Sequence, residues 1–438
     1  MDYYDHVLNI AATLGKELLQ SGANLERVNL VMTSILHAYE IHDISLHTLS
    51  TNLIISGVDK NGESHIKQVR VSPLDVDLTK VKELYRVANE IYRDTPDPAL
   101  AYEKIHEVSS AKPIPWFFSL LGFLLAMACL CRMFGGTWQE IVIAELNTSI
   151  LFFLTMGLGK LKLNKILTNF IAMFAVTSTS LLFAYIGFIA NCYTVIITNA
   201  FFLINGIGMV NAIRNLLCGN EMNGVIEFFK VCFELLATVT GIAASFFLFG
   251  NWYNVMVEDA IVIPKTTFLA NLELVVLSFF ASVGFSMVFK IRNWKDLLFA
   301  GLGGVIVRVV YLPLLQVVPE YRLLYISISA LAAALYAEIL SKIQKRTSTY
   351  YLYPSIVPLI PGDLIYYAAL GIVWAKPEMF ATNAGECLLH LIGLSVGFVL
   401  CSTVVYLIRR GKISKALLHF NHKKNAEGNT PVKEIEEE

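Results

Sequence analysis

Charge is scarce in this sequence. Only 16% of its 438 residues are Asp, Glu, Lys or Arg, whereas a soluble domain carries about 25%. Hydrophobic residues make up 55% of the chain, and the mean hydropathy is +0.59. The net charge of −1 provides no basic excess, so we expect no nucleic-acid partner. The composition therefore predicts an integral membrane protein whose surroundings are the lipid bilayer.

Signals of several other protein classes are also absent. The opening segment, MDYYDHVLNIAATLGKELLQ, lacks the basic start of a signal peptide. There is no Walker A motif, which argues against direct drive by ATP, and no HExxH motif. The cysteines all lie in or beside apolar segments, which argues against a disulfide framework or a zinc site. His37, His42 and His47 do not share one helical face, so we expect no metal site and no cofactor.

One motif is compatible with an enzyme. Residues 393–397, GLSVG, match the nucleophile-elbow pattern G-x-S-x-G, which requires a strand-turn-helix context. Here the motif lies inside a continuous apolar stretch, where small residues allow helices to pack closely. We therefore predict no enzyme activity and no catalytic residue. A membrane-anchored hydrolase or a sensor that uses the N-terminal region is the alternative from another functional class.

Residues 1–112 differ in composition from the rest and predict a small cytosolic α+β domain. Apolar residues follow helical spacing in two segments before residue 40, and strand-like segments flank a hairpin turn at Lys60-Asn61-Gly62. The expected strands cover 44–50, 52–58 and 65–71, and later helices cover 77–93 and 98–109. The segment KPIP at 112–115 connects this domain to the membrane part.

The remainder contains ten stretches that can each span a bilayer, which takes about 20 residues. They lie near 115–134, 138–157, 167–189, 193–217, 228–250, 268–289, 297–318, 321–341, 352–374 and 385–408. The second is the least clear, because it contains Glu140, Glu145 and Asn147. We assign the first five spans to residues 113–250, the second five to 251–410, and a polar C-terminal tail to 411–438.

Loop charge predicts the orientation. If the N-terminal domain is cytoplasmic, the outside connections hold only Arg132, Lys265, Arg322 and Lys376. The inside connections hold many more cations, namely Lys160, Lys162, Lys165, Arg214, Lys290, Arg292, Lys295, Lys342, Lys345, Arg346, Arg409, Arg410, Lys412 and Lys415. Positive residues favour the cytoplasmic side. We therefore expect a multi-pass protein of the plasma membrane with both termini in the cytoplasm.

Two of the membrane segments are interrupted. Segment 203–224, LINGIGMVNAIRNLLCGNEMNG, contains several Gly and Asn residues and an arginine. Such residues weaken a helix or are costly in lipid, and a purely structural span would avoid them. Segment 359–368, LIPGDLIYYA, contains a similar break. The freed backbone groups and half-helix ends can bind a zwitterion or an anion.

The two breaks belong to an internal repeat. Trp138 and Trp294 are 156 residues apart, and the same distance in sequence separates Gly206 from Gly362. Repeated marks at one offset indicate duplicated structure. Each copy then holds five spans, and this odd number inverts the second copy in the membrane. Inverted repeats with interrupted helices are typical of secondary transporters.

At these residues the chain resembles the threonine/serine exporter family, in its bacterial form with both halves fused. The resemblance is carried by Leu14-Gly15, Gly22-Ala23, Arg27-Val28, Phe134–Trp138 (FGGTW), Asn205-Gly206, Asn211–Leu217 (NAIRNLL), Gly219, Gly224 and Pro358–Gly362 (PLIPG). It implies a cytosolic N-terminal domain, ten spans, and export of a small amino acid or, in relatives, of a dicarboxylate. The family usually has Pro-Gly where this chain has Asn205-Gly206, and Ile-Arg-Asp where it has Ile213-Arg214-Asn215.

The candidate substrate-binding residues come from the two interrupted segments. They are Asn205, Gly206, Asn211, Arg214, Asn215, Pro361, Gly362 and Asp363. Simpler interpretations stay open: Arg214 could snorkel at the membrane surface, the Asn side chains could pack between helices, and Asp363 could cap a half-helix. For coupling to protons or ions, the candidates are Asp363, Glu145 and Arg308, because they are ionisable at membrane depth.

The sequence thus predicts a secondary transporter that exports threonine- or serine-like amino acids and is driven by a proton or ion gradient. Export of a dicarboxylate such as succinate is the alternative within transport. The direction of transport follows from the family resemblance alone. The expected partners are a small-molecule substrate and the bilayer, and a homo-oligomer stays open.

Overall fold

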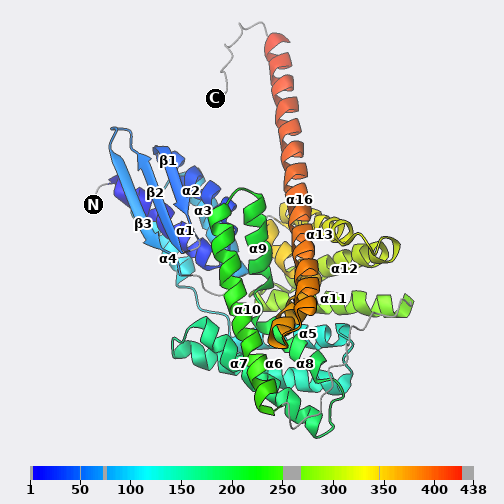
Figure 1. Ribbon diagram of the computed structural model, residues 1–438. Helices are drawn as coiled ribbons and strands as arrows, with labels where there is room; N and C mark the ends of the chain where they lie inside the picture. Colours follow the sequence, from blue (N-terminus) through cyan, green and yellow to red (C-terminus); the bar gives the residue numbers. More distant parts are fainter. Residues whose placement is uncertain (1–2, 50, 73–75, 250–267, 345, 427–438) are drawn as a thin grey trace.

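The structure, a computed structural model, describes residues 3–49, 51–72, 76–249, 268–344 and 346–426. It is mostly helical and has two parts (Figure 1). A small α+β domain at the N-terminus lies against a larger helical bundle. The predicted fold class is confirmed in this respect, since the described strands are confined to the N-terminal domain.

The N-terminal domain places helices on a three-stranded sheet. Its elements are α1 (Tyr3–Gln20), α2 (Leu25–Ala38), β1 (His42–Thr48), β2 (Asn52–Val58), β3 (Ser64–Arg70), α3 (Leu78–Asp94) and α4 (Pro98–Ser109). The antiparallel sheet has the order β1-β2-β3. Leu53 and Ile55 of β2 are fully buried, as the alternating pattern requires, and join a core formed with α1, α2 and α3. The predicted helices and strands of this region are confirmed.

His65 fastens α1 to the sheet. Its Nδ1 lies 3.2 Å from Oδ1 of Asp5, and its Nε2 lies 3.3 Å from Oδ2 of Asp59. Burial opposes the charged imidazolium, but hydrogen bonds to Asp5 and Asp59 and their negative charges outweigh it and raise the pKa of His65. Burial also opposes ionisation of Asp59, yet hydrogen bonds from the Glu63 N–H and from His65 hold its pKa below the ordinary value.

The raised pKa of His65 makes the N-terminal domain sensitive to pH. His65 stabilises the folded domain below its unfolded pKa of about 6.5, and this contribution is lost as the pH rises through the higher folded value. We expect the β3 amides to exchange hydrogen faster at pH 8 than at pH 6, after correction for the intrinsic rate. Hydrogen-exchange mass spectrometry of the full-length protein measures this, and His65→Gln should remove the difference. The same pH dependence in that variant would assign the effect to another group.

The bundle follows as a series of helices. They are α5 (Trp116–Met133), α6 (Trp138–Lys160), α7 (Lys165–Tyr185), α8 (Cys192–Leu203), α9 (Gly206–Leu217), α10 (Glu221–Phe249), α11 (Phe268–Val288), α12 (Trp294–Val317), α13 (Arg322–Gln344), α14 (Ser348–Ile356), the short 3-10 helix η2 (Val357–Leu359), α15 (Gly362–Val373) and α16 (Pro377–Ala426). The predicted domain boundary at 250 lies outside the described residues. Of the predicted tail, 411–426 continue α16, and 427–438 are also outside the description.

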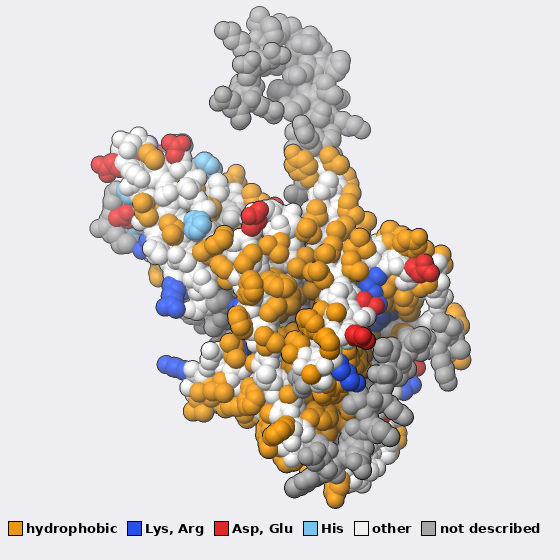
Figure 2. All heavy atoms as spheres, in the orientation of Figure 1, with side chains coloured by type: hydrophobic (Ala, Val, Ile, Leu, Met, Phe, Trp, Pro, Cys, Tyr) orange, Lys and Arg blue, Asp and Glu red, His pale blue; other side chains and the backbone are white. Residues whose placement is uncertain are grey.

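Eight of the described helices are long and apolar enough to cross a membrane, namely α5, α6, α7, α10, α11, α12, α13 and α16. The number rises to ten if α8 with α9, and α14 and η2 with α15, each count as one broken span. These two pairs bend by 58° and 52°. Figure 2 shows hydrophobic side chains over most of the bundle surface in that view. The chain is therefore a multi-pass membrane protein.

Helix boundaries repeat at the predicted spacing. The first broken pair occupies Cys192–Leu203 and Gly206–Leu217, and the second occupies Ser348–Leu359 and Gly362–Val373. Every boundary of the second pair lies 156 residues after its counterpart in the first. Helices α6 and α12 also begin at Trp138 and Trp294, the residues that marked the repeat in the sequence.

A buried carboxylate holds the beginning of the first broken span. Glu140, in the first turn of α6, is 2% exposed. One of its oxygens accepts the backbone N–H groups of Ala190 and Asn191, both at 3.1 Å, just before α8 begins. The N-terminal N–H groups of a helix have no partner within the helix, and a carboxylate satisfies them well. Glu140 therefore fixes where α8 starts relative to α6.

The second broken span has an equivalent carboxylate with different donors. Asp296, in the first turn of α12, is 1% exposed. It accepts the hydroxyl groups of Tyr350 at 3.3 Å and Tyr351 at 2.9 Å, and it pairs with Arg346 at 3.3 Å. Both tyrosines lie in the first turn of α14. The second half thus uses side chains where the first half uses backbone groups.

The N-terminal domain is attached to the bundle at the start of α3 and at α10. The N–H of Leu78 donates to the carbonyl of Phe289 at 3.0 Å, and the hydroxyl of Thr79 donates to the carbonyl of Lys290 at 2.6 Å. The side chain of Asn223 in α10 donates to a carbonyl at the end of β1, at 2.8 Å. Figure 1 shows the domain beside α9 and α10. The contact covers the end of α11, close to the start of the second broken span.

Candidate functional site

The two breaks have the same local conformation. At Asn205, φ and ψ are −79° and 69°, and at Pro361 they are −80° and 58°. Each following glycine donates its N–H to the carbonyl two residues earlier, at 2.9 Å, so both breaks contain a tight turn. Asn205 also caps α9, because its Oδ1 accepts the N–H of Gly208 at 2.9 Å. Asn205 therefore supports the same turn as Pro361 and adds a side-chain cap.

The breaks lie against each other through their glycines. A Cβ atom added to Gly206 would lie 2.5 Å from Cγ2 of Ile360, in the second break. A Cβ added to Gly362 would overlap the ring of Phe201, in the last turn of α8. Both positions therefore allow only glycine at this spacing. The two interrupted segments therefore lie opposite each other.

Two side chains bind the carbonyl groups that the second break leaves without helical partners. Nη2 of Arg308 in α12 lies 3.4 Å from the carbonyl oxygen of Pro358, and its Nε donates to Oγ of Ser278 at 3.0 Å. Nε2 of His390 in α16 lies 2.6 Å from the carbonyl oxygen of Leu359. Because a carbonyl only accepts, this contact places the imidazole proton on Nε2. Nδ1 of His390 is then an acceptor, and it is buried with no hydrogen-bond partner in the described part of the chain.

Asp363 lies at the N-terminus of α15, directly after the break. Its carboxylate lies in the first turn of α15, where the N–H groups at the helix terminus have no partner within the helix. It also interacts electrostatically with Arg308 from α12. Arg322 of α13 and Glu386 of α16, which pair with each other at 2.9 Å, influence it from another side. Four helices thus bring charged groups of both signs to the second break.

The polar residues of α9 face other partners. Nδ2 of Asn211 donates to the hydroxyl of Tyr353 in α14 at 3.2 Å, which links the two broken spans. Asn215 donates to Glu227 of α10 at 3.5 Å. Arg214, in the last turn of α9, interacts electrostatically with Tyr353. The predicted residues therefore form two groups, one at the breaks and one along α9 beside Tyr353.

Glu145 lies apart from both groups. Its Oε1 is buried without a hydrogen-bond partner in the described ranges. The structure therefore brings Arg308 and Asp363, but not Glu145, to the broken spans. Sequence reasoning gave no role to Tyr353, Glu227 or His390. A contact with a freed backbone carbonyl leaves no signal in the sequence.

The nucleophile-elbow motif lies in the interior of α16. The hydroxyl of Ser395 donates to the carbonyl of Leu391 at 2.9 Å, as serine does inside helices. A Cβ added to Gly397 would lie 2.6 Å from both the Cβ of Ala330 and the carbonyl oxygen of Ser327 in α13. The strand-turn-helix context is absent at this serine. The small residues instead allow α13 and α16 to pack closely.

An apolar bundle with two bent, interrupted spans that meet through glycines, and with ionisable groups gathered at one break, defines a membrane transport protein. The chain belongs to the threonine/serine exporter family. The family model described as "Putative threonine/serine exporter" matches residues 9–249, and "Threonine/Serine exporter, ThrE" matches residues 274–404. This is a family of exporters rather than of enzymes.

Two curated proteins illustrate the range of this resemblance. The "Threonine/serine exporter" of Corynebacterium glutamicum is 23% identical over 427 residues, which cover 94% of this chain and 86% of that protein. The "Probable succinate transporter subunit YjjP" of Escherichia coli (strain K12) is 19% identical over 245 residues, covering 56% of this chain and 95% of that protein. No solved structure gives a significant match.

Proposed function

We propose that this protein exports small zwitterionic amino acids, with threonine and serine as the best-fitting substrates. The observation that carries the proposal is that Arg308 and Asp363 both lie at the second break, Arg308 at the carbonyl of Pro358 and Asp363 in the first turn of α15. Arg308 can bind an α-carboxylate with charge-assisted hydrogen bonds, and Asp363 can bind an α-ammonium group. A zwitterion could bridge these two side chains.

The balance of charge favours an amino acid over a dicarboxylate. Arg308 and Arg322 are matched by Asp363 and Glu386, so the groups that interact at the second break are neutral in sum. A substrate with two negative charges would leave one carboxylate without a cation, and an unpaired charge is costly at low dielectric. A zwitterion preserves neutrality and suits this site better.

A hydroxyl group on the substrate also has a partner available. Nδ1 of His390 is a buried acceptor beside the second break, and its tautomer is set by the bond from Nε2 to the carbonyl of Leu359. The hydroxyl of serine or threonine can donate to it, whereas alanine would leave it unpaired. A site built around a hydrogen-bonding group rejects substrates that lack the matching group.

The transport mechanism that fits this architecture is alternating access between two inverted repeats of five spans each. The 156-residue offset of the broken pairs supports the repeat, and an odd number of spans supports the inversion. We place the protein in the plasma membrane with both termini in the cytoplasm, because the predicted cytoplasmic loops carry most of the positive charge. A proton or ion gradient would supply the energy, with Asp363 as the proposed coupling group.

Counterflow in proteoliposomes tests the proposal. Vesicles loaded with unlabelled serine should accumulate labelled serine and threonine, take up labelled alanine more slowly, and exclude labelled succinate. Asp363→Asn should reduce the exchange of the amino acids by at least about tenfold, because it removes a charged hydrogen-bond partner. Accumulation of succinate with exclusion of the amino acids would overturn the proposal in favour of the dicarboxylate function.

A further inference from the structure

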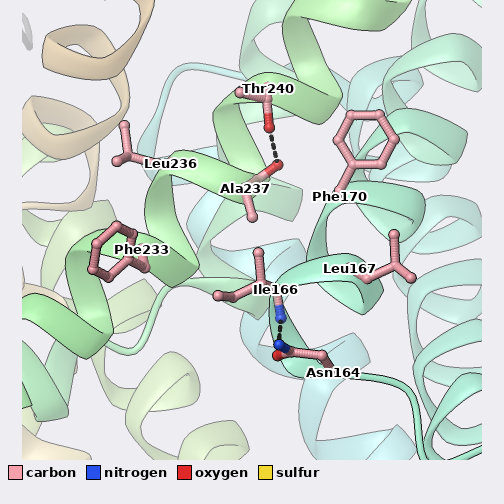
Figure 3. Close-up of a pocket in the computed structure, with 8 residues that line it drawn as sticks. All are labelled: Asn164, Ile166, Leu167, Phe170, Phe233, Leu236, Ala237 and Thr240. Atoms are coloured by element: carbon pink, nitrogen blue, oxygen red, sulfur yellow. Dashed lines mark hydrogen bonds between the residues drawn. The ribbon is translucent and has the colours of Figure 1, made fainter.

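An apolar groove lies on the outside of the bundle, between α7 and α10 (Figure 3). Its volume is about 420 Å³, which is the size of a ligand pocket. The walls are Ile166, Leu167 and Phe170 from α7 and Phe233, Leu236 and Ala237 from α10. Several of these side chains are exposed, and Phe233 reaches 56%.

The polar groups of the groove are already occupied. The hydroxyl of Thr240 donates to the carbonyl of Ala237 at 2.9 Å, and Oδ1 of Asn164 accepts the N–H of Ile166 at 3.1 Å. Figure 3 shows both side chains turned back to the backbone by these bonds. The groove therefore offers an apolar surface to its occupant. From Phe233 to Thr240 it follows α10 for about 10 Å, which is roughly two thirds of one bilayer leaflet.

The mouth of the groove is basic. The connection between α6 and α7 carries Lys160, Lys162 and Lys165 beside Asn164. Lys165 pairs with the buried Glu234 of α10 at 2.9 Å, and this pair closes the space between the helices at that end. Lys160 and Lys162 are exposed and form no ion pair among the residues that the structure describes. Because α6 and α7 both cross the membrane, their connection lies at the membrane surface.

We infer that this groove binds one anionic phospholipid, with an acyl chain between α7 and α10 and the phosphate at Lys160 and Lys162. The charge at the mouth selects the headgroup, because lysines near a membrane surface attract anionic lipids. The apolar walls hold the chain through buried area. Lys165 is neutralised by Glu234 and supports the site by keeping the two helices in place.

The equivalent place in the second half differs at the described positions that correspond to the groove and to the lysines. Position 393 in α16 corresponds to Ala237 and is glycine, and a Cβ added there would lie 3.0 Å from Cγ2 of Ile326 in α13. A glycine of α16 thus packs against α13 at the position that corresponds to Ala237, which lines the groove. The positions that correspond to Lys160 and Lys162 are Gln316 and Val318. Groove and lysines occur together in one half, which is the pattern expected of a single lipid site.

Native mass spectrometry of the full-length protein tests this inference, with phosphatidylglycerol and phosphatidylcholine added in equal amounts. The wild-type protein should retain phosphatidylglycerol in preference to phosphatidylcholine. The double variant Lys160→Gln, Lys162→Gln should lose about tenfold of that preference. Ala237→Trp, which fills the groove, should reduce retention of both lipids.

A matched pair of substitutions provides the control. Arg292→Gln with Lys295→Gln removes the same charge from the connection between α11 and α12, and the preference should stay as in the wild type. Equal retention of both lipids by the wild-type protein would overturn the inference. So would an equal loss in the control variant, because the lysines would then act only through overall charge. Each of these outcomes is independent of the transported substrate.

Discussion

Arg308→Gln is expected to lower the rate of serine counterflow by about 100-fold while the protein still folds and inserts. Arg308 is 9% exposed, and its guanidinium reaches both Ser278 and the carbonyl of Pro358. It is therefore held in place before substrate arrives. Glutamine keeps one hydrogen-bonding group but removes the charge that binds a carboxylate, and loss of a charged hydrogen bond in a buried site has this order of effect. Initial rates over a range of serine concentrations measure the change.

Two further variants distinguish a role of Arg308 in binding the substrate from a role in stabilising the backbone at the second break. Arg308→Lys keeps the charge and should recover part of the rate, which a purely structural role would not predict. Arg132→Gln removes an arginine from an ion pair with Glu273 that is about half exposed on both sides, and its rate should stay near that of the wild type. Normal counterflow by Arg308→Gln would show that the substrate carboxylate binds elsewhere.

Gly206→Leu should reduce counterflow to the background of empty vesicles. The Cβ alone would approach Ile360 to 2.5 Å, and the remaining atoms of leucine would have to enter the second break. The two broken spans would then be forced apart or locked in one arrangement. Overpacking of this kind costs about 1–3 kcal/mol in stability, so the protein should still be recovered from the membrane. Counterflow together with size-exclusion profiles records both effects.

A second glycine of the membrane part gives the control. Gly157 in α6 has open space around it, since no atom lies within 4 Å of an added Cβ. Gly157→Leu makes the same chemical change in a membrane helix and should leave counterflow close to the wild-type rate. The variant Gly206→Leu, Ile360→Ala should regain activity if the clash is the cause. Full activity of Gly206→Leu alone would contradict a transport path in which the breaks move against each other.

Much of the fold could be predicted from the sequence, because its determinants are local. Hydrophobic length specifies the membrane helices, and the period of apolar residues specifies the elements of the N-terminal domain. The repeat was also visible, since Trp138 and Trp294 are rare residues at a fixed offset. The number of spans was less certain, because the bend within each broken pair decides whether two short helices count as one span.

The site could be predicted only in part. The break residues Gly206 and Gly362 were identified because glycine in a membrane helix requires a local reason. Their partners could not be identified, since a contact such as that of His390 with the carbonyl of Leu359 joins positions 31 residues apart through a backbone atom. Glu145 is a coupling candidate because of its expected depth in the membrane, but this depth does not determine which helix its side chain contacts. The polar partners of α9, such as Tyr353, were missed for the same reason.

The two buried carboxylates at the starts of the broken spans, Glu140 and Asp296, differ in how their hydrogen bonds respond to substitution of their partners. Glu140 binds backbone N–H groups of Ala190 and Asn191, and nearly any residue at those two positions supplies the same donors. Asp296 binds Tyr350, Tyr351 and Arg346, and a single substitution at any of these weakens it by a small step. The bonds to Glu140 therefore persist when those two residues change, whereas the bonds to Asp296 depend on the identity of its partners. A substitution at Tyr350, Tyr351 or Arg346 would therefore change the attachment of the second broken span and leave that of the first as it is.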